Sequence, residues 1–124
     1  MDYESFLIEV IDGGMEAAGK DYAGDSPSRT RKREGAIKGF EECRGKTPEE
    51  LAALLTSSNA RTQEAYREQD DDYWYWRCRA LEIEWVCNVV SAMLQNEGRR
   101  PLAAHLPTAR GVMRAAEIVG VAAA

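Results

Sequence analysis

The chain has 124 residues, of which 44% are hydrophobic and 30% are charged. This length fits one domain whose core is large enough to fold without disulfides or metal ions, and the composition excludes a disordered chain. The sequence has no apolar run of transmembrane length, and its opening residues carry acids where a secretory signal carries bases. We therefore expect a single domain over residues 1–124 that is cytoplasmic and does not contact a membrane.

The net charge of −5 is unevenly distributed along the sequence. Residues 1–25 and 47–72 are acidic, with net charges of −6 and −5, whereas residues 26–46 carry +4 and residues 73–124 carry +2. Oppositely charged helices could lie side by side in the fold, which is the interpretation we favour. Alternatively, an acidic and a basic surface could face different partners.

The three cysteines, Cys43, Cys78 and Cys87, form no CxxC pair. If Cys78 and Cys87 share a helix, they lie on opposite faces, because nine residues at about 100° each give about two and a half turns. They could then neither form a disulfide nor hold one metal ion together. We expect all three to be buried thiols in a reducing compartment.

Helical periodicity is nearly continuous, and four prolines punctuate it. The first predicted helix covers about residues 3–22 and has one apolar stripe. A glycine pair interrupts this helix, and its second member, Gly14, lies close to the stripe, where a tight helix crossing would explain it. The second predicted helix begins at Ser26-Pro27 and ends near Gly45.

The third predicted helix begins with Thr47-Pro48-Glu49-Glu50, which combines a threonine cap, a proline at the first position and the glutamate of a capping box. The helix reaches about Gln69 and could break near residues 57–59. Its apolar stripe consists of Leu51, Leu54, Leu55, Ser58, Thr62, Ala65 and Tyr66.

The fourth predicted helix lies near residues 72–96, where Asp70, Asp71 and Asp72 cap its positive end. Its polar strip, which includes Asn88 and Ser91, is only about 60° wide at 100° per residue, so other helices must surround it. After a short connection, a last helix begins at Thr108. The sequence thus predicts an all-α fold, a single compact bundle of about five helices with the helix near residues 72–96 buried at its centre.

Two features of this central helix are unusual for a bundle core. The run Tyr73-Trp74-Tyr75-Trp76 spans about 300° of the helix, so one core can hardly bury all four rings. Tyr73 lies on the polar strip and is the best candidate for an exposed binding anchor. Arg79 and Glu82 fall within the apolar arc, where they could pair and extend to its edge, or could contact a partner or a second copy in a homodimer.

A basic cluster lies at the start of the second predicted helix, where cations oppose the helix dipole. Its members are Arg29, Arg31, Lys32 and Arg33. The cluster could bind phosphate groups, or it could form ion pairs with the acidic helices on either side. It is short and lacks interleaved aromatic residues, and the pI is near 5.0, so nucleic acid is the weaker of the partners considered.

The sequence contains no enzyme signature. It has no P-loop, no GxGxxG, GxSxG or HExxH motif, and no metal-ligand spacing. The single histidine, His105, lies in a predicted loop beside a proline and is best explained as solvated surface. We therefore expect a protein that is not an enzyme and has no catalytic residues, no cofactor and no metal site.

Three stretches resemble small proteins encoded by bacteriophages and prophages. They are RKREGAIKGFEECRGKTPEELAALL at 31–55, DDDYWYWRCRALEIEWVCNVVSA at 70–92 and PTARGVMRAAEIVGV at 107–121. The resemblance implies a small acidic accessory protein that binds and inhibits a host protein, a class that includes anti-CRISPR proteins. It assigns no catalytic residues.

Our leading hypothesis is a non-enzymatic protein-binding module, a phage or prophage accessory protein that acts on a host factor such as a CRISPR-Cas component. Charge segregation and surplus aromatic residues support it. The predicted contact residues are Arg29, Arg31, Lys32, Arg33, Asp70, Asp71, Asp72 and Tyr73. The alternative is a small nucleic-acid-binding regulator that uses the basic cluster at 29–33.

Overall fold

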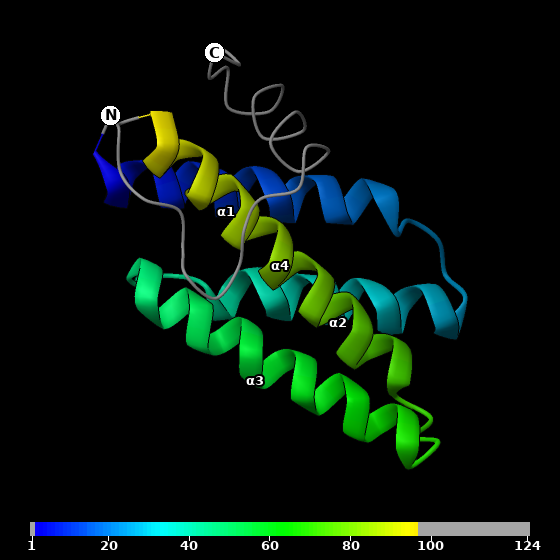
Figure 1. The fold of residues 1–124 in the computed structure, drawn as a ribbon. Coiled ribbons are helices and arrows are strands. Elements are labelled where there is room, and N and C mark those ends of the chain that lie inside the picture. The colour runs from blue at the N-terminus through cyan, green and yellow to red at the C-terminus, as the bar shows by residue number, and fades with distance from the viewer. Residues whose placement is uncertain (1, 97–124) are drawn as a thin grey trace.

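A computed structural model describes residues 2–96, and residue 1 and residues 97–124 lie outside the described part (Figure 1). The described residues form four helices, which confirms the all-α class. The helices are α1 (Tyr3–Asp21), α2 (Pro27–Glu42), α3 (Pro48–Arg67) and α4 (Tyr73–Asn96). The prediction of about five helices is therefore too high for this part of the chain, and the last predicted helix, from Thr108, lies outside it.

α2 and α3 begin at the capping residues that the sequence indicated. The side chain of Ser26 accepts a hydrogen bond from the backbone N–H of Arg29 at the start of α2. At the start of α3, Thr47 and Glu50 each accept from the other's backbone N–H, at 3.2 and 3.0 Å, and complete the capping box. These caps satisfy N–H groups that have no partner inside the helix, so they fix where each helix begins.

α3 continues without interruption through residues 57–59, so the break considered there does not occur. The hydroxyls of Ser57 and Ser58 donate to backbone carbonyls three residues earlier, at 3.0 and 2.9 Å. Because both hydroxyls are satisfied inside the helix, they do not compete with its backbone hydrogen bonds. Ser58 is completely buried and faces the core.

α4 is the centre of the bundle, as predicted. Among the described helices, it packs against each of the other three, most extensively against α2 and α3 (Figure 1). α1 contacts α2 and α4, whereas α3 contacts α4 alone. Two members of the predicted polar strip, Asn88 and Ser91, are buried as well, so this strip is shorter than the sequence indicated.

Gly14 of α1 has the packing role that the sequence suggested. A Cβ atom at this position would overlap with the ring of Phe40 in α2. That ring is 1% exposed and packs edge-on against Trp85 of α4, with ring centroids 5.8 Å apart. The preceding residue, Gly13, has no atom within contact distance of such a Cβ. Only the second glycine of the pair therefore sets the spacing between α1 and α2.

α2 crosses α4 at two further glycines, Gly35 and Gly39. The sequence did not indicate this contact. A Cβ atom on Gly39 would lie 2.5 Å from the carbonyl oxygen of Arg79, and one on Gly35 would lie still closer to the carbonyl oxygen of Tyr75. The two backbones therefore touch, because glycine has no side chain to separate them. Both glycines are buried.

All three cysteines are free and buried, as predicted. Burial raises the pKa of the Cys43 and Cys78 thiols and raises the pKa of Cys87 to about 12. Because the thiolate is the reactive form, we expect iodoacetamide at pH 8 to modify the native protein about 100-fold more slowly than the denatured protein. Mass spectrometry of samples taken over time measures both rates, and fast native labelling of Cys43 or Cys87 would contradict this core.

Candidate functional site

The aromatic run at the start of α4 is held by cations from α2 and α3. Each ring from 74 to 76 has a cation over its face, where the ring quadrupole attracts positive charge. The pairs are Lys32–Trp74 at 4.7 Å, Arg31–Tyr75 at 4.0 Å and Arg61–Trp76 at 4.3 Å from the ring centroid. The aromatic run and the basic cluster, each unusual in the sequence, therefore partly explain each other.

Arg31 also forms a bidentate ion pair with Asp72, the residue before α4. Its Nε and Nη2 atoms lie 2.9 and 3.0 Å from the two carboxylate oxygens. A further bond of 2.7 Å joins Arg31 to Glu34. The hydrogen bond from Arg31 lowers the pKa of Asp72 below its usual value, so the carboxylate stays charged at a lower pH. This pair ties the first turns of α2 to the turn between α3 and α4.

The other two arginines of the basic cluster face the loop between α1 and α2. Arg33 donates to the carbonyl oxygens of Tyr22 and Gly24, at 2.7 and 3.3 Å. Arg29 lies 3.4 Å from the carbonyl oxygen of Asp21. The cations of the basic cluster thus contact different parts of the chain itself.

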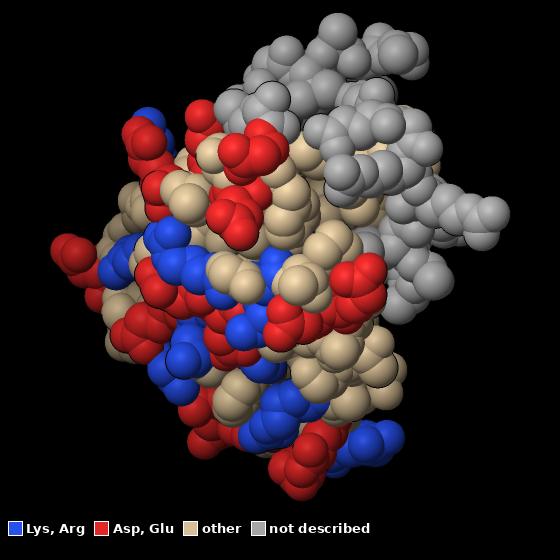
Figure 2. Space-filling model, turned by 90° about the vertical axis from the view of Figure 1, so that its left-hand side faces the viewer, with Lys and Arg blue, Asp and Glu red and all other residues tan. Residues whose placement is uncertain are grey.

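Acidic and basic side chains are interleaved at the surface. On the face shown in Figure 2, blue and red groups alternate over short distances and do not form two separate areas. Three ion pairs between residues far apart in the sequence also place opposite charges next to each other. They are Arg31–Asp72, Arg44–Asp12 and Arg79–Glu42, at 2.9, 2.8 and 2.6 Å. This supports the interpretation in which oppositely charged helices lie side by side.

Arg79 takes a different partner from the one considered in the sequence. Its Nε and Nη2 atoms bind the carboxylate of Glu42 at the end of α2, at 3.0 and 2.6 Å, and the two side chains are only 12% and 22% exposed. The close crossing at Gly39 brings the last turn of α2 within reach of Arg79. Arg79 is therefore held by Glu42 of α2, and it gives no argument for a homodimer.

Three rings form an exposed row where α3 meets α4, which we call the aromatic edge: Tyr66, Tyr73 and Trp74. Tyr73 packs edge-to-face against both neighbours, with ring centroids 5.9 Å from Tyr66 and 5.3 Å from Trp74. Tyr66 is 72% exposed and Trp74 is 53% exposed, whereas Tyr73 between them is partly buried. The most exposed aromatic residues are thus the two neighbours of the predicted anchor.

Tyr66 was expected inside the apolar stripe of α3, and the turn after α3 explains why it is exposed. Gln69 adopts a left-handed conformation with φ of 52°, and its N–H donates to the carbonyl of Tyr66. The N–H of Asp70 donates to the carbonyl of Ala65, which completes a Schellman motif. Ala65 is completely buried, and Tyr66 is left uncovered.

The three aspartates before α4 have different environments. Asp70 accepts a hydrogen bond from the backbone N–H of Asp72 at 2.8 Å and pairs with Arg61 at 3.4 Å. Asp71 is exposed. The three aspartates therefore do not act together as a cap. Asp70 stabilises the turn before α4, and Asp72 binds Arg31.

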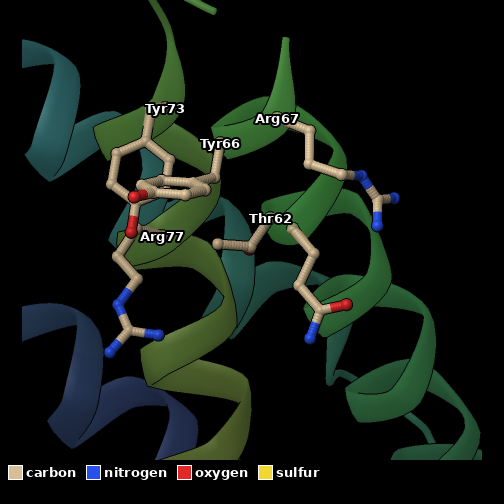
Figure 3. Close-up of a pocket in the computed structure, with 6 residues that line it drawn as sticks. Thr62, Tyr66, Arg67, Tyr73 and Arg77 are labelled. Atoms are coloured by element: carbon tan, nitrogen blue, oxygen red, sulfur yellow. The ribbon is translucent and has the colours of Figure 1, made fainter. Parts of the chain in front are cut away.

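A hollow of about 290 Å³ lies beside the aromatic edge, between α3 and α4 (Figure 3). We call it the Arg–Tyr hollow, and it is lined by Thr62, Gln63, Tyr66, Arg67, Tyr73 and Arg77. Figure 3 shows the two tyrosine rings beside each other, with Arg77 extending from α4 on one side and Arg67 from α3 on the other. The volume is near the lower end of the range for small-molecule sites, about 300 Å³.

Six of the eight predicted contact residues lie around the start of α4, whereas Arg29 and Arg33 face the loop between α1 and α2. The six are Arg31, Lys32, Asp70, Asp71, Asp72 and Tyr73. Tyr66 and Arg67 are not among the predicted contact residues, because helical periodicity assigned Tyr66 to the core and no pattern in the sequence marked Arg67. Tyr73 was chosen as the exposed ring, although the length of the aromatic run indicated only that at least one of the four rings had to be exposed.

No protein-family model matches the chain, and neither a curated protein nor a solved structure is significantly similar to it. Within residues 2–96, no helix combines the length and apolar character needed to cross a membrane. The same residues contain no group of three or more His, Cys, Asp or Glu side chains that could hold a metal ion.

Proposed function

We propose that the chain is a non-enzymatic protein-binding module whose contact surface is centred on the aromatic edge. The observation that supports this most directly is the exposure of Tyr66 and Trp74 on two helices that are packed together. Exposed aromatic surface is unfavourable in water, and covering it with a partner releases that free energy. Tyrosine and tryptophan are also enriched among the residues that dominate protein–protein interfaces.

The resemblance to small phage and prophage proteins suggests the kind of partner. In that setting the partner would be a host protein in the bacterial cytoplasm, such as a component of a CRISPR-Cas system, and binding would inhibit it. The net charge of −5 and the contacts that the basic cluster makes within the chain favour a protein over nucleic acid.

Replacing both exposed rings of the aromatic edge should strongly reduce partner capture. We expect the tagged protein to retain a partner from host lysate after nuclease treatment, as read by mass spectrometry. The Tyr66→Ser/Trp74→Ser variant should retain about tenfold less, because it removes two large contact side chains. Its thermal midpoint should stay within a few degrees of the unmodified protein, since both side chains are largely exposed.

Ile8→Ser provides the matched control, because Ile8 is a 54% exposed apolar residue on α1 and lies outside the aromatic edge. This variant should retain the same partner as the unmodified protein. Equal retention by the aromatic-edge variant would show that the edge is not the contact surface. Partners that disappear on nuclease treatment would instead support the nucleic-acid-binding alternative at residues 29–33.

A further inference from the structure

The arginines of the described residues divide into two groups. Six of them contact a carboxylate or a backbone carbonyl of the chain: Arg29, Arg31, Arg33, Arg44, Arg61 and Arg79. Arg67 and Arg77 make no such contact within residues 2–96, and both are exposed. These are the two arginines that line the Arg–Tyr hollow.

The rest of the Arg–Tyr hollow has no acidic side chain. The rings of Tyr66 and Tyr73 form one wall, and the amide of Gln63 adds a polar group. The hydroxyl of Thr62 already lies 2.9 Å from the carbonyl of Ser58 and 3.0 Å from that of Trp76, so the hydroxyl has its partners inside the protein. The hollow thus combines aromatic surface with two guanidinium groups that have no anionic partner within residues 2–96.

A ligand that fits these groups is partly apolar and carries anionic groups on two sides. The volume of about 290 Å³ suits one large side chain. Guanidinium groups bind carboxylates in charge-assisted, often bidentate geometry, and tyrosine rings pack well against aromatic or aliphatic side chains. An apolar residue flanked by aspartates or glutamates has both properties.

We propose that the Arg–Tyr hollow binds an acidic segment of the partner protein, with an apolar side chain against Tyr66 and Tyr73 and carboxylates on Arg67 and Arg77. This inference rests on the proposed function and specifies the chemistry of the partner. A nucleic acid fits less well, because it presents a continuous row of phosphates. Within residues 2–96, only Arg67 and Arg77 lack a carboxylate or carbonyl partner, and two guanidinium groups are too few to match such a row.

Peptide titration followed by NMR tests the inference directly. The probe is a decapeptide in which glutamate and phenylalanine alternate, added to ¹⁵N-labelled full chain at up to millimolar concentration. The side-chain Nε–Hε signals of Arg67 and Arg77 should shift. A peptide in which glutamine replaces every glutamate should bind about tenfold more weakly, because it lacks the charge-assisted contacts. No shift at either arginine, or equal binding of the two peptides, would overturn the inference.

Two variants of equal net charge separate local contact from general electrostatic attraction. Arg67→Gln/Arg77→Gln should weaken binding of the glutamate peptide about tenfold. Lys20→Gln/Lys38→Gln removes two exposed positive charges from α1 and α2 and should leave binding nearly unchanged. Equal losses in both variants would show that the hollow does not recognise the peptide. Tighter binding of a ten-nucleotide single-stranded DNA than of the peptide would also overturn the inference, in favour of nucleic acid.

The host-lysate experiment distinguishes this inference from the proposed function. If Tyr66→Ser/Trp74→Ser loses the partner and Arg67→Gln/Arg77→Gln retains it, the aromatic edge binds a protein and the inference about the hollow fails. If both variants retain the partner, the proposed function fails as well. Loss of the partner in both variants, together with the peptide result, supports both statements.

Discussion

The Gly39→Ala variant should lose about 3 kcal/mol of unfolding free energy. A Cβ atom at this position would lie 2.5 Å from the carbonyl oxygen of Arg79, and this neighbour is backbone that cannot rotate away. The substitution therefore forces α2 and α4 apart and opens gaps in the core around them. Urea unfolding followed by circular dichroism measures the loss as a lower midpoint at an unchanged slope.

Gly13→Ala is the control for this variant, because Gly13 also lies inside a helix but has no atom within contact distance of a new Cβ. Here alanine should stabilise the protein by up to about 1 kcal/mol through its higher helix propensity. The two alanine substitutions should therefore change stability in opposite directions. A Gly39→Ala protein as stable as the unmodified chain would show that the backbones are farther apart than the structure places them.

The Arg79→Met variant should be destabilised by about 3 kcal/mol, because it leaves the Glu42 carboxylate largely buried without its guanidinium. The two side chains are 12% and 22% exposed, and two hydrogen bonds of 3.0 and 2.6 Å join them. Thermal and urea unfolding at pH 7 measure the change.

A double-mutant cycle identifies the cause of that loss. Adding Glu42→Met to Arg79→Met should restore most of the stability, because no unpaired charge then remains. Lys20→Met serves as a comparison, since the Lys20–Glu16 pair is 78% and 73% exposed and its loss should cost less than about 0.5 kcal/mol. If Arg79→Met costs no more than Lys20→Met, then the pair with Glu42 is solvated and not a structural contact of the core.

Features of this fold that depend on a few adjacent residues could be predicted from the sequence. Ser26-Pro27 and the capping box at Thr47 and Glu50 act within one turn, so a short stretch is enough to identify them. The buried character of α4 could also be predicted, because apolar residues cover most of its circumference. The contact of α2 with α4 at Gly35 and Gly39 could not, since it depends on which faces of two distant segments meet.

The candidate site was predicted in part for a similar reason. The aromatic run and the basic cluster stand out by composition, and the structure brings Lys32 and Trp74 together. The exposure of Tyr66 could not be predicted. It depends on Gln69 adopting a left-handed conformation, which is typical of glycine or asparagine and not of glutamine. Helical periodicity shows which residues share a face of α3, but it does not show which part of that face the following helix covers.

The attachment of the aromatic edge to α2 has a consequence for the speed and cost of association. Lys32 restrains the Trp74 ring, and the Arg31–Asp72 pair fixes the turn that precedes it. Side chains ordered before an encounter lose less entropy during it, by about 0.5 to 1.5 kcal/mol each. The first turns of α2 would thus influence affinity without belonging to the proposed contact surface. A substitution that makes these turns of α2 more mobile would slow association, although it would change none of the contacting atoms.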